Sequence, residues 1–151
     1  MAFWDTSAIL PLCCWQPETM YSRRLRREFP RMIVWWGTPV EARSALARLV
    51  REEHLTPEKR LRAAARLAQL RIAWDEMLPT EKVRVLAEEM PDTHGIRAAD
   101  ALQLAAALVW CREHPKQRPF VCFDANLRKA ARALGFSVRP SMSPRDGGRT
   151  P

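Results

Sequence analysis

Acidic side chains stand beside four separate segments of this sequence that are otherwise apolar or begin helices. They are Asp5, Glu41, Asp100 and Asp124. Two carboxylates 4 Å apart repel by about 4 kcal/mol at an effective dielectric of 20, so a cluster of them must hold protons or bind cations. Oxygen ligands without histidine or thiolate favour Mg²⁺ or Mn²⁺. Such an ion can activate water and stabilise the leaving oxygen of a phosphodiester.

Asp100 lies in the most hydrophobic stretch of the chain, Ala98–Trp110, which is apolar except at Asp100 and Gln103. A helix that is apolar on all sides is a buried one. An ionised carboxylate buried without a partner costs several kcal/mol, so Asp100 must be neutral, paired, or open to a polar site. A salt bridge to Arg97 or the positive end of the helix would also account for it.

Asp5 and Asp124 each follow a short apolar run of strand length. Ala2–Trp4 predicts a buried strand, followed by a turn and a helix from about Ala8. Phe120–Phe123 predicts a second buried strand, and the Asp124 side chain is suited to cap the helix that follows. An acid therefore stands at the carboxyl end of two predicted strands.

Glu41 follows a third predicted strand, Met32–Trp36. Thr38 is a good N-cap and Pro39 fits the first helical position. Glu41 stands three residues after Thr38, which predicts a capping box. This local role is the alternative to a role for Glu41 in the acidic cluster.

The remaining pattern alternates helices with short strands. Helices are expected over residues 21–31, 38–53, 57–70, 81–90 and 125–134, strands over 72–78 and 136–138, and a loop over 92–95. This alternation indicates an α/β fold with a mainly parallel sheet. Sites in such sheets form beyond the carboxyl ends of the strands, near the topological switch point, where all four acids could meet.

Length and composition indicate one domain, residues 1–140, followed by a disordered tail at 141–151. The formal net charge of +8 points toward an anionic partner such as nucleic acid. The four cysteines show no C-x-x-C spacing, which argues against a zinc site. With no secretory signal and no apolar run long enough to span a membrane, we expect a soluble, cytoplasmic protein.

Four ordered motifs carry a family resemblance. They are Phe3-Trp4-Asp5-Thr6-Ser7-Ala8, Val40–Leu49, Arg97–Ala105, and Phe123–Leu127 with Gly135-Phe136. Together they resemble the PIN-domain nucleases, in particular the VapC-type toxins of toxin–antitoxin pairs. The resemblance runs in order from about residue 2 to residue 139.

The resemblance implies a three-layer α/β/α sandwich around a mainly parallel sheet of four or five strands, with Mg²⁺- or Mn²⁺-dependent endoribonuclease activity. By position, the catalytic and metal-binding tetrad would be Asp5, Glu41, Asp100 and Asp124. Thr6 or Ser7 would lie near the metal through a hydroxyl. Asn126 stands where some relatives have a further acid, and its amide could still orient a water. The family also implies homodimers, an RNA substrate and inhibition by a small antitoxin.

Two other interpretations remain open. The first is a PIN-like module that binds RNA or a protein without cutting. The second is another metal-dependent α/β enzyme, such as an aspartate-phosphorylating receiver or a phosphatase. Enzymes of these kinds have a strand followed by Asp-x-Asp, or they need a lysine at the end of a later strand. Here Asp5 precedes Thr6 and Ser7, and Lys129 lies inside a predicted helix.

Overall fold

A five-stranded, all-parallel sheet forms the centre of the protein in the computed structural model, which describes residues 1–142. The strand order across the sheet is β3-β2-β1-β4-β5. The strands are β1 (Ala2–Trp4), β2 (Met32–Trp35), β3 (Trp74–Met77), β4 (Pro119–Val121) and β5 (Ser137–Arg139). The predicted α/β class and parallel sheet are therefore confirmed.

Helices connect the strands as the sequence pattern predicted, with one addition. Within residues 1–142 they are α1 (Thr6–Cys13), α2 (Thr19–Glu28), α3 (Thr38–Arg51), α4 (Pro57–Arg71), α5 (Glu81–Glu88), α6 (Met90–His94), α7 (Ala98–Trp110) and α8 (Ala125–Ala133). The loop expected over residues 92–95 was wrong, since most of it belongs to α6. Pro91 stands in the first turn of α6, and Gly95 ends it with a left-handed φ of 64°.

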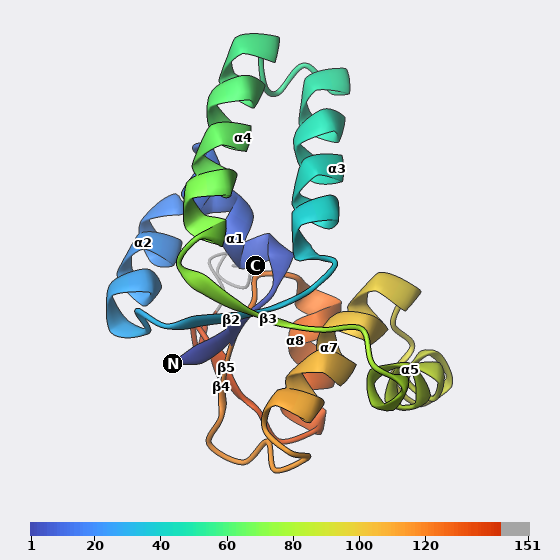
Figure 1. Ribbon diagram of the computed structural model, residues 1–151. Coiled ribbons are helices and arrows are strands. Elements are labelled where there is room, and N and C mark those ends of the chain that lie inside the picture. Colours follow the sequence, from blue (N-terminus) through green and yellow to red (C-terminus); the bar gives the residue numbers. More distant parts are fainter. Residues whose placement is uncertain (143–151) are drawn as a thin grey trace, which may run out of the picture.

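Each face of the sheet is covered by its own set of helices, because successive strand residues point to opposite faces. Phe3, Ile33 and Trp35 pack with residues of α5, α6, α7 and α8 on one face. Trp4 and Val34 pack with residues of α1, α2 and α4 on the other. This is a three-layer α/β/α sandwich, and Figure 1 shows α3 and α4 extending beyond it as a long hairpin.

The topological switch point lies between β1 and β4. From β1 the chain builds outward through β2 and β3 on one side, and β4 and β5 complete the sheet on the other side. Asp5 follows β1 directly, and Asp124 follows β4 after two residues. Their position at the carboxyl ends of neighbouring strands is the location predicted for a site.

Part of the predicted tail, residues 143–151, lies outside the residues that the structure describes. Within residues 1–142, no helix is both long and apolar enough to cross a membrane.

Candidate functional site

A cleft of about 790 Å³ opens at the carboxyl end of the sheet. Its lining includes all four predicted acids and both neighbouring hydroxyl residues: Asp5, Thr6, Ser7, Glu41, Asp100 and Asp124. These residues come from the ends of two strands and the first turns of α1, α3 and α7. The fold thus brings the predicted set together, except for Asn126, which is exposed on the first turn of α8 and does not line the cleft.

Asp5 is buried in the wall of the cleft, with 4% of its surface exposed. It is the N-cap of α1 and accepts a hydrogen bond from the Ser7 backbone N–H at 2.9 Å. The Ser7 hydroxyl and, at 3.5 Å, the Cys122 thiol also donate to it. All three bonds reach Oδ2, so Oδ1 accepts no hydrogen bond from the described residues.

Ser7 joins the ends of the two central strands. Its hydroxyl donates to Asp5 and accepts hydrogen bonds from the backbone N–H groups of Phe123, at 2.9 Å, and Asp124, at 3.3 Å. Asp124 in turn caps α8 by accepting from the Leu127 backbone N–H at 2.9 Å, as the sequence predicted. A single hydroxyl therefore links the positions of Asp5 and Asp124.

Glu41 does not take part in the predicted capping box, so that interpretation was wrong. The N-cap position of α3 is Gly37, which has no side chain to cap the helix. Thr38 is the first residue of the helix and is fully buried, so it is not the N-cap. Glu41 Oε2 instead accepts hydrogen bonds from the Thr6 hydroxyl, at 2.7 Å, and from Gln103 Nε2, at 2.8 Å. Its carboxylate is thus oriented by residues from α1 and α7.

Gln103 is a residue of the site that sequence reasoning missed. Its side chain is 1% exposed, and Nε2 donates to the Thr6 hydroxyl at 2.8 Å as well as to Glu41. The available signal was its spacing, since Gln103 stands three residues after Asp100 in an otherwise apolar stretch and so lies on the same side of α7.

The electrostatics of the cleft reflect acids that face one another. Burial, assisted by the charge of Glu41, raises the pKa of Asp5 to about 6 against the lowering effect of the Ser7 and Cys122 hydrogen bonds. Burial also raises the pKa of Asp100, with Asp124 and Glu41 adding to the effect. Arg97 opposes that rise without forming an ion pair with Asp100 among the described residues.

The cysteines of the chain are all free thiols. Cys111 and Cys122 are buried, as expected for small hydrophobic side chains, whereas Cys13 and Cys14 are half-buried. Cys122 also has a polar role, because it donates to Asp5. Burial raises the pKa of the Cys122 thiol well above its usual value, so the group remains a protonated donor.

The donor set fits a hard divalent cation in its chemistry. The oxygen-rich group contains no histidine, and Asp5, Glu41 and Asp124 each have one oxygen anchored by hydrogen bonds and one that accepts none from the described residues. Within residues 1–142, no three His, Cys, Asp or Glu side chains are gathered closely enough to hold an ion as they stand.

Comparison with solved structures finds proteins of similar fold. No protein-family model and no curated protein matches the sequence. The fold is similar to that of a toxin–antitoxin complex from Klebsiella pneumoniae, with a TM-score of 0.59 over 82% of this chain and 87% of that chain. The sequence identity is 11%, so the likeness is one of fold.

Proposed function

We propose that the protein is a Mg²⁺- or Mn²⁺-dependent endoribonuclease that hydrolyses RNA phosphodiester bonds, and that it is the toxin of a VapBC-type toxin–antitoxin pair. The observation that carries the proposal is the convergence of four acids from distant parts of the chain in one cleft at the switch point. The net charge of +8 makes this local acidity unusual and suits an RNA partner. The fold likeness to a toxin–antitoxin complex supports the assignment.

The residues of the cleft have distinct roles in this proposal. Asp5 and Asp100 hold the principal ion, and Glu41 and Asp124 complete the cluster or orient the attacking water. A bound Mg²⁺ or Mn²⁺ would supply an acidified water and neutralise charge on the phosphate. Hydrogen bonds from Thr6, Ser7 and Gln103 fix one oxygen of an acid and leave the other for the ion, as outer-shell groups do in metal sites.

The family resemblance supplies the partners of the proposed toxin. They are a small VapB-like antitoxin and a second copy of the chain, in the cytoplasm. Exposed apolar side chains on α2, α3 and α4, such as Met20, Val40 and Leu61, are available for such contacts.

A second candidate is a PIN-like module that binds RNA or protein without cutting. It is favoured by the observation that no three acids of residues 1–142 are gathered to hold an ion as they stand. The two candidates differ in whether a divalent ion binds and whether RNA is cut.

The deciding experiment incubates the purified protein with total RNA in EDTA, in Mg²⁺ and in Mn²⁺, and records the melting temperature under the same conditions. We expect cleavage only with a divalent ion. The ion should also raise the melting temperature, since a ligand at 100 times its Kd stabilises the folded state by about 2.7 kcal/mol. Absence of both effects would overturn the nuclease and favour the binding module.

Expression in a bacterial host tests the toxin role separately. Wild type should arrest growth and produce new RNA ends on sequencing, whereas Asp5→Asn should do neither. Equal growth arrest by both chains would show that any toxicity does not depend on the acidic cleft.

A further inference from the structure

Trp15 is a large aromatic side chain left in solvent at the candidate site. It stands between α1 and α2, is 81% exposed, and lines the same cleft as the four acids. Trp36 is also substantially exposed, at 49%, but does not line this cleft. Burying an aromatic side chain is strongly favourable, so a tryptophan held in water at the mouth of a cleft indicates a contact with another molecule.

The backbone on both sides of Trp15 is fixed by hydrogen bonds. The Cys14 N–H donates to the Leu10 carbonyl at 3.1 Å. After Trp15, the Gln16 N–H donates to the Thr19 hydroxyl at 2.8 Å, and the Thr19 N–H returns a bond to the Gln16 carbonyl at 2.9 Å. The Thr19 hydroxyl itself donates to the Pro11 carbonyl at 3.1 Å. The position of Trp15 is therefore organised in advance, which lowers the entropic cost of binding.

An arginine and a histidine line the same cleft. Arg48 on α3 and His54, just beyond that helix, both do so with their side chains exposed. The Arg48 Nε atom lies 3.9 Å from Glu52 Oε1, a loose and exposed ion pair that a phosphate could replace. The outer part of the cleft thus combines a flat aromatic surface with positive charge, while its inner part is acidic.

We infer that Trp15 stacks on an unpaired base of the RNA strand whose phosphate enters the acidic part of the cleft. The inference rests on the proposed function and adds a residue, Trp15, that positions the RNA strand in the cleft. A base next to a phosphate matches an aromatic side chain, Trp15, in the same cleft as a cationic one, Arg48. In a duplex the faces of internal bases are covered by their neighbours, so Trp15 has no base to stack on. Since Trp15 shares its cleft with acids and arginine, the surroundings fit RNA better than the apolar pocket of a protein partner.

The test measures binding by fluorescence anisotropy in EDTA at low salt, where metal-dependent cleavage is absent. The probes are a labelled single-stranded RNA, the same length of abasic strand, and an RNA duplex. We expect Trp15→Ala to weaken single-strand binding by about 5- to 150-fold, the range that corresponds to 1–3 kcal/mol of base–aromatic stacking. Trp15→Phe should keep most of the affinity, and the control Trp36→Ala should match wild type. The abasic strand and the duplex should bind wild type and Trp15→Ala equally.

Two results would overturn the inference. One is single-strand affinity unchanged in Trp15→Ala, which would assign Trp15 to a protein partner instead. The other is an equal loss of affinity for the single strand and the abasic strand, which would exclude stacking on a base. Cleavage by wild type together with unchanged binding by Trp15→Ala would leave the nuclease proposal standing and end this one. Single-strand binding that depends on Trp15, without cleavage in either ion, would support stacking by Trp15 and overturn the nuclease proposal.

Discussion

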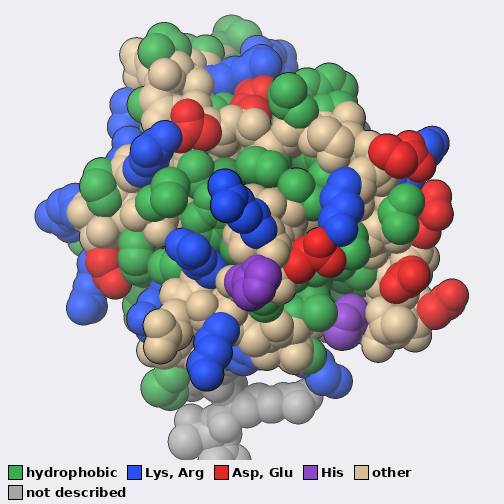
Figure 2. Space-filling model, turned by 60° about the horizontal axis from the view of Figure 1, so that its bottom comes forward, with side chains coloured by type: hydrophobic (Ala, Val, Ile, Leu, Met, Phe, Trp, Pro, Cys, Tyr) green, Lys and Arg blue, Asp and Glu red, His purple; other side chains and the backbone are tan. Residues whose placement is uncertain are grey.

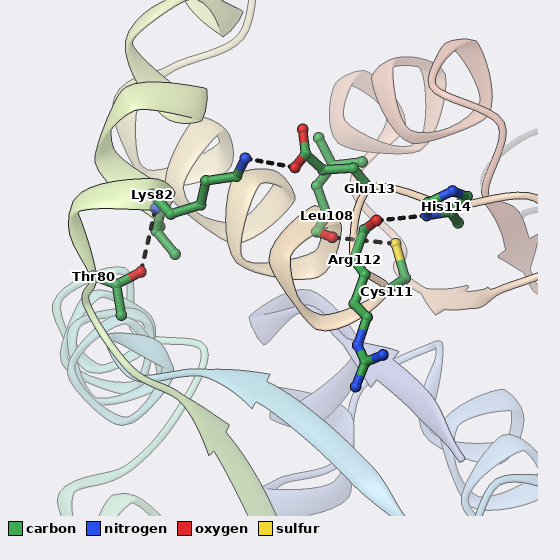
Figure 3. Close-up of polar contacts among 8 residues, drawn as sticks. Thr80, Lys82, Leu108, Cys111, Arg112, Glu113 and His114 are labelled. Atoms are coloured by element: carbon green, nitrogen blue, oxygen red, sulfur yellow. Dashed lines mark hydrogen bonds and ion pairs between the residues drawn. The ribbon is translucent and has the colours of Figure 1, made fainter.

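The two ends of the sheet differ in how their charged side chains are paired. At the carboxyl end, burial and the charge of Glu41 raise the pKa values of Asp5 and Asp100, and none of these three acids forms an ion pair among the described residues. At the other end of α7, Lys82 and Glu113 pair at 2.6 Å (Figure 3). The face that includes this end shows acidic and basic side chains interspersed (Figure 2).

Unusual backbone geometry at the paired end has a local structural role. The segment after α7 holds Arg112, Glu113 and Gln117 at left-handed φ values of 53°, 60° and 63°. Hydrogen bonds satisfy it, including one from the Glu113 N–H to the Leu108 carbonyl at 2.8 Å. Unusual backbone here ends a helix and turns the chain toward β4. The feature that indicates function is the group of unpaired acids at the opposite end.

The largest expected effect is on RNA cleavage, and it is seen by comparing variants that neutralise one acid at each end. Asp100→Asn should reduce RNA cleavage by more than about 100-fold, beyond what loss of an outer-shell partner costs. It should leave the fold intact or more stable, because repulsion by Asp124 and Glu41 is relieved. Glu113→Gln should leave cleavage unchanged. Cleavage rates in Mg²⁺ and urea unfolding of both variants check this.

Retained cleavage by Asp100→Asn would remove Asp100 from the chemistry and erase the contrast between the ends. A loss of cleavage together with a loss of stability would leave Asp100 as a structural residue, so both measurements are needed.

A second comparison concerns stability and pH. The folded pKa of Asp5 is about 6, against 3.8 when unfolded, so the folded state binds the proton more tightly. Stability from this group is complete below about pH 4 and is lost as the pH rises through about 6. Asp5→Asn should remove that loss. Its free energy of unfolding should exceed that of wild type by up to about 3 kcal/mol above pH 6, for a pKa shift of about two pH units. Urea unfolding in EDTA across this pH range measures it.

The matched control is Glu113→Gln, whose free energy of unfolding should stay within about 1 kcal/mol of wild type at every pH, the range for an exposed ion pair. An Asp5→Asn curve parallel to that of wild type over the same pH range would show that Asp5 is already ionised and stabilised in the folded protein.

Elements with unambiguous local signals were predictable from the sequence. The apolar run Ala2–Trp4 predicted β1 with its observed bounds. The apolar stretch Ala98–Trp110 likewise predicted the observed bounds of α7. The capping box at Thr38 failed because the same residue types serve two purposes. A local signal cannot tell that Glu41 has a better partner in Thr6, 35 residues away in the sequence.

For the candidate site, the placement of the acids was predictable from the sequence, but the hydrogen bonds that orient them were not. That Asp5 and Asp124 meet follows from parallel strands sharing one edge. Glu41 and Asp100 could join them because each lies in the first turn of a helix at that edge, and the family resemblance assigned all four to one tetrad. The hydrogen bonds that orient these acids were not predictable. They join residues such as Gln103 with Thr6, 97 positions apart, or Cys122 with Asp5, 117 apart, and nothing in the local sequence of either partner encodes the pairing.

The smallest expected effect tests whether the two ends are independent. Lys82 and Glu113 are both about half exposed, and such surface pairs contribute about 0–1 kcal/mol. Lys82→Met should therefore lower the free energy of unfolding by less than about 1 kcal/mol, equally at pH 5 and pH 7, and leave cleavage unchanged. A double-mutant cycle with Glu113→Gln isolates the pair. Because α7 connects this ion pair to Asp100, a fall in cleavage with Lys82→Met would mean that the helix transmits changes along its length. The acidic cleft would then depend on the paired end of the molecule, and the contrast between the two ends would not hold.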